Sequence, residues 1–283
     1  MSGFKLEKGK YGTKMIIQSE WKKEYKEIIK SNNVKELYLN YAKGWKGKDL
    51  SFLQSLQDLE AFTILDFTIK DISPIHFLTS LRYLNISTYC NTKIDFTKFP
   101  CLEECFLEWR KGADSIFECV TLKKLYINNY KGKTADKFAK LKNLESLKIG
   151  NSPIENIEGL GQLHQLRELG LYYLRKLTSL RGIENLRNLE VLDLYTCRKI
   201  TSLEPIKGLV NLRKLLFNNM GEIDSIKVLE KLPNLEWVLF YESTNVVDGD
   251  LTPLTKLQKL SKLAFQNRRH YTHKCEDFPA CQR

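Results

Sequence analysis

Apolar residues recur along this chain in a unit of nearly constant length. Two consecutive copies, LRELGLYYLRKLTSLRGIENLRN from Leu166 and LEVLDLYTCRKITSLEPIKGLVN from Leu189, are each 23 residues long. Each copy opens with Leu-x-x-Leu-x-Leu, where alternation of apolar and other residues predicts a short β-strand. Apolar residues then follow at every third position, which suits extended or 3₁₀ turns better than an α-helix. This periodicity predicts a solenoid.

The six-residue opening occurs eleven times, and neighbouring copies begin 20 to 25 residues apart. The copies begin at Val34, Leu59, Leu81, Leu102, Leu122, Leu144, Leu166, Leu189, Leu212, Leu235 and Leu260. This pattern resembles the leucine-rich repeat family, and in particular its short repeats of about 22 residues, which occur in bacterial proteins and in a phosphatase-regulating subfamily. The resemblance covers residues 34–267. It implies an α/β solenoid, a horseshoe with a parallel concave sheet and a convex side of short 3₁₀ or irregular turns.

Residues 1–33 lack the repeat and predict an N-terminal cap, because a solenoid otherwise exposes the apolar side of its first repeat. Phe4–Leu6 and Thr13–Ile17 predict a hairpin, and Ser19 fits the N-cap of a following helix. The apolar face of this amphipathic helix comprises Trp21, Tyr25, Ile28 and Ile29. A helix that binds a partner is the alternative interpretation.

Residues 268–283 also lack the repeat and predict a C-terminal cap or tail, in which Tyr271 and Phe278 fold over the last repeat. Two histidines and two cysteines in this segment, His270, His273, Cys275 and Cys281, have no firm zinc-binding spacing. We therefore predict no metal site.

The composition of the chain argues against a membrane protein and against a secreted protein. No run approaches the roughly 18 to 20 apolar residues of a membrane helix, and the first residues, MSGFKLEKGKYGTK, lack the apolar stretch of a secretory signal. The seven cysteines are irregularly spaced, which predicts reduced thiols. We expect a monomeric cytoplasmic protein that does not associate with membranes.

Alternation within the strands predicts a second surface opposite the core. The apolar positions of each opening point into the core, whereas its third, fifth, seventh and eighth positions form what we call the inner face. Eleven of these 44 positions are aromatic, including Tyr41, although aromatic residues make up only 11% of the chain. Strands favour aromatic residues in general, but Tyr and Trp also dominate binding hot spots. The predicted partner-binding residues are Tyr38, Tyr83, Phe106, Glu108, Trp109, Tyr126, Tyr172, Tyr173, Tyr195, Trp237 and Tyr241.

Charge is distributed unevenly. The chain has a net charge of +11, but acidic residues outnumber basic ones on the inner face by seven to four. Basic residues recur just after the strands, so stacking of the repeats brings them to one edge. This basic rim comprises Lys43, Arg110, Lys111, Lys131, Arg175, Lys176, Arg198, Lys199, Arg268 and Arg269. It is interpreted either as a site for phosphates or an acidic partner, or as solvated loop charge.

Signals for catalysis are missing from the sequence. It contains no glycine-rich phosphate loop and no nucleophile elbow. His76 and His164 lie in connectors more than three repeats apart, and paired carboxylates such as Glu104 and Glu108 on an open sheet are more often solvated than catalytic. We predict that the protein is not an enzyme and needs no cofactor.

These patterns predict a non-catalytic module that binds another protein on its inner face. The resemblance implies an inhibitor or immunity protein of bacterial or phage-related origin, or a regulatory subunit of an enzyme such as a phosphatase. An alternative is a binder of nucleic acid or a phosphate ligand through the basic rim. That alternative ranks lower because the inner-face aromatics lie among acidic rather than basic residues.

Overall fold

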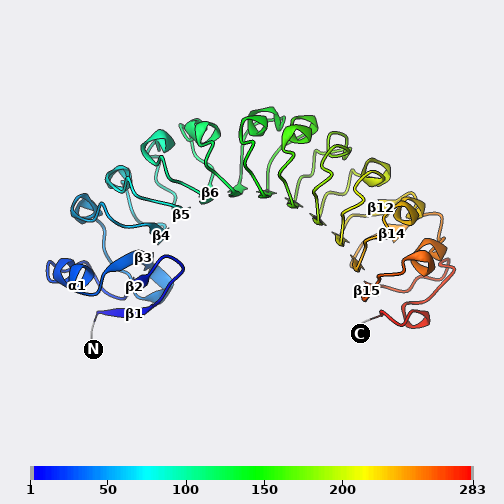
Figure 1. Cartoon of the computed structure of the whole chain (residues 1–283), viewed down its shortest axis with the longest axis horizontal. Helices are drawn as coiled ribbons and strands as arrows, with labels where there is room; N and C mark the ends of the chain where they lie inside the picture. The colour runs from blue at the N-terminus through cyan, green and yellow to red at the C-terminus, as the bar shows by residue number, and fades with distance from the viewer. Residues whose placement is uncertain (1–2, 282–283) are drawn as a thin grey trace. The chain divides into compact units, whose positions relative to one another are not determined.

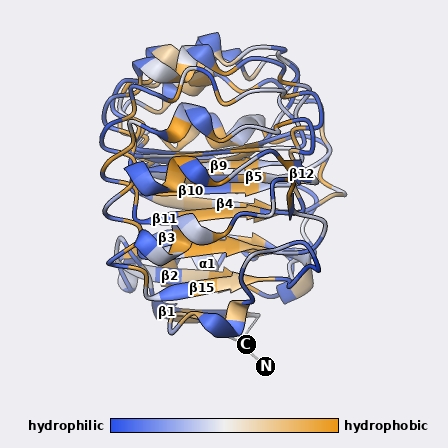
Figure 2. Cartoon of the chain, turned by 90° about the vertical axis from the view of Figure 1, so that its right-hand side faces the viewer, coloured by the Kyte–Doolittle hydropathy of each residue, from blue (hydrophilic) through white to orange (hydrophobic). Residues whose placement is uncertain are grey.

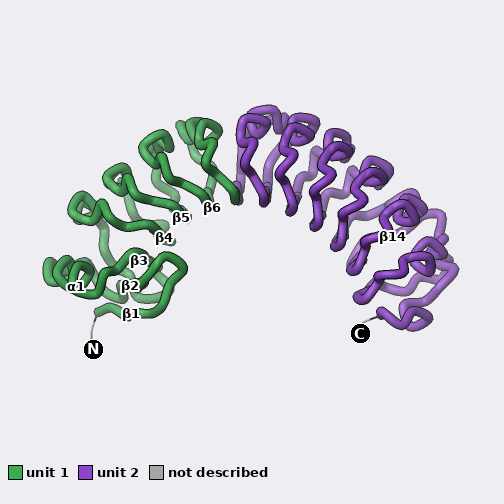
Figure 3. The backbone as a smooth tube through the Cα atoms, in the orientation of Figure 1, with its two compact units in different colours: residues 1–125 green, residues 126–283 purple. Residues whose placement is uncertain are grey.

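A computed structural model describes residues 3–281 of the chain (Figure 1). It contains two compact units, Met1–Leu125 and Tyr126–Arg283 (Figure 3). Strand β7 (Lys124–Asn128) lies at the division between them. The elements of each unit are therefore described separately, and the predicted division into a cap, repeats and a tail stays a prediction.

In unit 1, the first two strands form an antiparallel hairpin, and each later strand pairs in parallel with the one before it. The strands are β1 (Phe4–Lys8), β2 (Thr13–Ile17), β3 (Val34–Asn40), β4 (Ala61–Leu65), β5 (Tyr83–Ser87) and β6 (Glu104–Glu108). The helix is α1 (Tyr25–Ser31), and the 3₁₀ turns are Tyr41–Lys43, Ser51–Ser55, Ser73–Phe77, Phe96–Lys98 and Asp114–Glu118.

In unit 2, the main sheet is parallel, and two short strands, β12 (Glu222–Ile223) and β14 (Asn245–Val246), pair separately. The main strands are β8 (Ser146–Gly150), β9 (Glu168–Tyr172), β10 (Val191–Tyr195), β11 (Lys214–Asn218), β13 (Trp237–Phe240) and β15 (Lys262–Phe265). The 3₁₀ turns are Asp136–Lys140, Glu158–Gln162, Glu204–Ile206, Lys227–Lys231, Thr252–Lys256 and Cys275–Asp277.

The observed strands overlap the predicted openings. From β4 onward, every strand of the main parallel run begins at the third residue of its opening, and β3 begins at Val34 itself. The inward positions are closed to solvent, as at Leu189, Leu192 and Leu194, each 0% exposed, and Figure 2 shows the strands coloured largely as hydrophobic. Parallel strands joined through short 3₁₀ turns confirm the predicted solenoid.

The helix begins later than the sequence predicts. Its N-cap is Glu24, without a side-chain hydrogen bond, so the prediction of Ser19 as the cap is wrong. The Ser19 hydroxyl instead lies 2.8 Å from the Tyr25 hydroxyl, and Trp21, which precedes the helix, stacks on Phe52 with ring centroids 3.8 Å apart. Packing of aromatic rings therefore fixes the conformation of the segment that precedes this helix.

Within residues 3–281, no helix combines the length and apolar character needed to cross a bilayer.

Side-chain amides join neighbouring repeats of unit 2 at the residue before each opening. Asn188, Asn211 and Asn234 each donate a hydrogen bond of 2.8 Å to a backbone carbonyl of the preceding repeat. Apolar or thiol residues occupy the turn that follows β9, β10 and β11. Leu174, Cys197 and Met220 are all 0% exposed, so they pack into the core.

An aromatic stack fills the core at the end of unit 2. Phe240 lies between Phe217 and Phe265, with centroid distances of 4.9 and 5.0 Å. Tyr271 and Phe278 then contact Phe265 edge-on, at 6.1 and 6.2 Å. The final segment is tied to the sheet by a 2.7 Å hydrogen bond from the backbone of Leu263 to Ala280.

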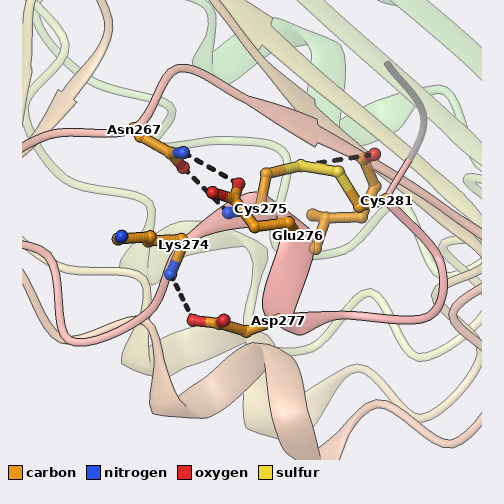
Figure 4. The surroundings of a disulfide bond; sticks show 7 residues. Asn267, Lys274, Cys275, Glu276, Asp277 and Cys281 are labelled. Atoms are coloured by element: carbon orange, nitrogen blue, oxygen red, sulfur yellow. Dashed lines mark hydrogen bonds between the residues drawn. A yellow bond between two sulfur atoms is a disulfide. The ribbon is translucent and has the colours of Figure 1, made fainter.

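The prediction that all seven cysteines are reduced is wrong at two of them. Cys275 and Cys281 form a disulfide with Cα atoms 5.6 Å apart (Figure 4). The Cys275 backbone also donates a 2.8 Å hydrogen bond to Asn267 Oδ1. The spacing of the cysteines in the sequence did not predict this disulfide. Two cysteines six residues apart can form a bridge only if the intervening turn brings their Cβ atoms together.

We expect a thiol titration without reductant to find five thiols after denaturation, since Cys90, Cys101, Cys105, Cys119 and Cys197 are free. In the folded protein only Cys90 and Cys101, which retain solvent access, should react quickly. Burial raises the pKa of Cys105, and it raises the pKa of Cys119 to about 12 and that of Cys197 to about 11, so little reactive thiolate forms. A count of seven would contradict the disulfide.

Candidate protein-binding surface

The inner face of unit 2 carries a cluster of tyrosines that we call the tyrosine cluster: Tyr173, Tyr195, Tyr241 and the neighbouring Glu242. The rings of Tyr173 and Tyr195 meet edge to face at 5.2 Å. The Tyr195 hydroxyl donates a 3.1 Å hydrogen bond to Glu242, 47 residues further along the chain. Tyr173 and Tyr241 remain 39% and 40% exposed. The cluster thus presents accessible rings, and the rings of Tyr173 and Tyr195 hold each other in position.

A second group of polar side chains on the inner face of unit 2 forms hydrogen bonds and ion pairs within the chain. The Tyr172 hydroxyl donates a 3.0 Å hydrogen bond to Asp193, and Lys148 pairs with Glu168 at 2.7 Å. Burial raises the pKa of Asp193, and burial together with the nearby Asp193 carboxylate raises the pKa of Tyr172. Tyr172 therefore has its ring, but not a free hydroxyl, to offer to a partner.

Trp237 lies between two lysines on β11 and β15. The ammonium groups of Lys214 and Lys262 lie 3.9 and 4.7 Å from its ring centroid, and both residues are its register partners in the sheet. Such cation–π contacts each contribute about 0.5 to 1 kcal/mol at exposed sites. They hold the indole and concentrate positive charge at this end of the inner face.

The backbone just after the strands of unit 2 adopts an uncommon conformation. The eighth residue of each opening from Asn129 to Glu242 has φ between 50° and 60°. Asn tolerates this left-handed region, but Tyr, Thr and Glu pay a steric cost. Tyr173, Thr196 and Glu242 adopt it at φ values of 57°, 58° and 60°. Strained residues of this kind concentrate at functional sites, and two of these three belong to the tyrosine cluster.

We expect Thr196→Asn to raise the free energy of unfolding by about 0.5 to 1 kcal/mol, because Asn accepts the left-handed backbone. The new amide oxygen can replace Thr196 Oγ1 as the acceptor for Asn219 Nδ2, which is now 3.0 Å away. The reverse change, Asn219→Thr, should lower the free energy by a similar amount. Calorimetric melting measures the stability of both variants. If the two substitutions changed the melting temperature equally and in the same direction, the proposed strain at Thr196 would be excluded.

The inner face of unit 1 is partly occupied by the chain itself. Lys10, in the turn between β1 and β2, forms a 2.7 Å ion pair with Glu104. The Tyr11 backbone donates a hydrogen bond to Glu36, and the Arg82 guanidinium lies over the Tyr11 ring at 4.9 Å. Glu36 and Glu104 are each only 9% exposed. This contact could not be predicted from the repeat pattern, because 94 residues separate Lys10 from Glu104.

The hairpin turn also affects the acidity of this face. Burial acts to raise the pKa of Glu104, but hydrogen bonds from Lys10 and Lys124 outweigh it, so the pKa lies below its usual value. The carboxylate is therefore charged at neutral pH and holds the turn in place. The charge of Glu104 is thus balanced by Lys10 and Lys124 of the same chain.

The remaining predicted aromatic residues of unit 1 are half-buried and contact their neighbours. Tyr83 packs on Phe106 at 5.5 Å, and Lys14 lies over the Tyr38 ring at 5.6 Å. Trp109 packs on Phe117 at 6.0 Å. Glu108 in unit 1 and Tyr126 in unit 2 are likewise half-buried. The predicted binding residues therefore differ in accessibility, and the tyrosine cluster contains the most exposed of them.

The basic rim is not uniformly available to solvent. Arg110 is only 6% exposed and donates hydrogen bonds to the backbone oxygens of Thr88 and Cys90, at 3.3 and 3.2 Å. Arg268 donates to the backbone oxygens of Glu242 and Thr244. These arginines link repeats rather than present charge. The exposed rim residues are Lys43, Lys111, Lys131, Arg175, Lys176, Arg198, Lys199 and Arg269.

No group of three or more His, Cys, Asp or Glu side chains suited to a metal ion occurs within residues 3–281. Cys275 and Cys281 are joined to each other, so their sulfurs are not metal ligands in this structure.

Several solved structures resemble this chain. An internalin from Listeria monocytogenes is 21% identical with a TM-score of 0.62, and the match covers 92% of this chain and 84% of that one. A leucine-rich repeat protein from Leptospira interrogans is 20% identical with a TM-score of 0.56, covering 82% and 66%. The functional domain of InlJ from Listeria monocytogenes is 17% identical with a TM-score of 0.54, covering 84% and 60%. No family model and no curated protein matches the sequence. Together with the strand and turn pattern, these likenesses show that the chain has the leucine-rich repeat fold.

Proposed function

We propose that this protein is a non-catalytic module that binds a partner protein through the inner face of unit 2. The tyrosine cluster carries the proposal, because Tyr173 and Tyr241 are accessible and Tyr195 is held by its contacts with Tyr173 and Glu242. Tyrosine offers a large contact area with few rotatable bonds, which lowers the entropic cost of binding. The left-handed backbone at Tyr173 and Glu242 supports it further, since such strain is rarely retained without a purpose.

Affinity purification of the full chain from native lysate, at low and at high salt, tests this function. We expect one protein to be retained at high salt in about a one-to-one ratio, because contacts through tyrosine rings are screened little by ions. A parallel purification with a variant of the tyrosine cluster should lose that protein. Retention of nucleic acid that is lost at high salt would point to the basic rim instead.

The finer roles are part of the proposal and differ only in what the partner does once it is bound. An inhibitor or immunity protein would block a toxin or an enzyme, whereas a regulatory subunit would redirect an enzyme such as a phosphatase. The bacterial origin of the similar structures is in line with the first role. Binding of nucleic acid by the basic rim has less support, because Arg110 and Arg268 donate hydrogen bonds to the backbone.

The predicted cytoplasmic location stays a prediction. The Cys275–Cys281 disulfide favours an oxidising compartment, because disulfides are rare where thiols are kept reduced. Thiol titration of protein isolated from its native source under alkylating conditions distinguishes the two locations.

A further inference from the structure

Three aromatic side chains form an exposed row in unit 1. Tyr41, Phe67 and Tyr89 come within two residues of the ends of β3, β4 and β5, and they are 54%, 40% and 73% exposed. Phe67 contacts both of the others, with centroid distances of 5.6 Å to Tyr41 and 4.5 Å to Tyr89. Contiguous exposed apolar surface of this kind is typical of interaction sites. We call these residues the aromatic row.

Each ring of the aromatic row follows directly after a buried polar residue. The three polar residues are Asn40, Asp66 and Thr88, which are 6%, 3% and 3% exposed. Asp66, for example, accepts hydrogen bonds from Trp45 Nε1 at 2.9 Å and from the Thr68 backbone at 2.7 Å. The loops that carry the rings are therefore fixed from within, while the rings themselves face solvent.

Arg110 holds the backbone on both sides of Tyr89. Its guanidinium donates to the Thr88 hydroxyl at 3.0 Å and to the backbone oxygens of Thr88 and Cys90. A rigidly presented side chain loses less entropy on binding than a mobile one. The most exposed ring of the row is thus also one of the best supported, which is the arrangement expected of a binding residue.

The segments that follow β3 to β6, three of which carry the aromatic row, are basic. Within residues 41–49, 66–71, 88–93 and 109–112, six exposed lysines stand against two exposed aspartates. The lysines are Lys43, Lys46, Lys48, Lys70, Lys93 and Lys111, and the aspartates are Asp49 and Asp71. Both aspartates already accept hydrogen bonds from serines, Ser51 and Ser73. A complementary partner therefore brings negative charge together with apolar contact.

The arrangement of the rings distinguishes between two kinds of acidic partner. Single-stranded nucleic acid is bound by stacking bases on free aromatic faces, but Phe67 and Tyr89 are stacked on each other with ring planes 29° apart. This stack covers one face of each ring, and the ring edges, which carry partial positive charge, suit aliphatic groups and carboxylates. We propose that the aromatic row binds a partner protein through a segment in which carboxylates alternate with apolar side chains.

Fluorescence anisotropy of labelled probes with the full chain tests this proposal. The probes are a short synthetic peptide that alternates Glu with Leu, its Lys counterpart, and a single-stranded oligothymidine. We expect the acidic peptide to bind, with an affinity that falls at least tenfold in Tyr89→Ala and falls as salt is raised. Lys70→Ala combined with Lys93→Ala should weaken binding and reduce its salt dependence.

Two variants of unit 2 serve as matched controls, Val210→Ala at an apolar side chain 45% exposed and Lys207→Ala at an exposed lysine. Both should bind the acidic peptide as the wild type does. Because Tyr89 is 73% exposed, its replacement leaves the core intact, which circular dichroism checks.

Three results would overturn the proposal: no binding of the acidic peptide, binding that Tyr89→Ala leaves unchanged, or binding of oligothymidine that Tyr89→Ala abolishes. The last would identify a nucleic-acid site. The aromatic row does not depend on the tyrosine cluster, so variants of that cluster should leave the acidic peptide bound. The proposal for the aromatic row and the proposal for the tyrosine cluster can therefore fail independently, and each failure is seen in its own experiment.

Discussion

Replacing Phe240 by alanine is expected to lower the free energy of unfolding by about 3 to 5 kcal/mol. The side chain is 1% exposed, and its ring stacks on both Phe217 and Phe265. Alanine leaves a cavity between the two rings and removes both stacking contacts. Each repeat of a solenoid is stabilised mainly by its neighbours, so the loss should extend to residues 241–281. Urea unfolding followed by circular dichroism measures the effect.

Phe240→Leu is the matched control for this cavity. Leucine occupies the equivalent position at Leu171 and Leu194, so this change retains most of the buried volume and should cost less than about 1.5 kcal/mol. Val247→Ala, at a side chain 48% exposed, should change the free energy by no more than about 0.5 kcal/mol. If Phe240→Ala unfolds at the wild-type urea concentration, the aromatic stack is not a source of stability.

The double variant Tyr173→Asn/Tyr195→Ala is expected to weaken binding of the partner by about 100- to 1000-fold. Asn is chosen at residue 173 because the backbone there has φ of 57°, which Asn tolerates better than Ala. The change removes the ring without adding strain. Isothermal titration calorimetry with the protein retained from lysate gives the affinity of each variant.

Two further variants separate the rings from their hydroxyls and from general surface effects. Tyr195→Phe keeps the ring contact with Tyr173 and loses only the hydrogen bond to Glu242, so we expect a loss of no more than about tenfold. Val210→Ala should leave the affinity unchanged. A double variant that binds as tightly as the wild type would rule out the tyrosine cluster as the contact. Because the two rings touch, the single changes are not expected to add.

Prediction from sequence succeeded where the pattern repeats. Leu189, Leu192 and Leu194 had to face the core because a strand alternates its side chains and only one face can be closed to water. The same rule placed Tyr172 and Tyr195 on the opposite face. It did not say which aromatic rings stay exposed, since that depends on the side chains that neighbouring repeats place beside them.

The sequence by itself determined the solenoid, the positions of its strands and the division between core and inner face, because these depend on periodicity within a single repeat. Only the tertiary structure decided that Lys10 pairs with Glu104, that the buried Arg110 donates hydrogen bonds to the backbone on both sides of Tyr89, and that Cys275 is joined to Cys281. Each of these contacts joins residues from different repeats or caps, or across an irregular turn. The pattern of apolar residues within one repeat does not predict which residues of different segments meet. These pairs form only when the folded chain brings the segments together.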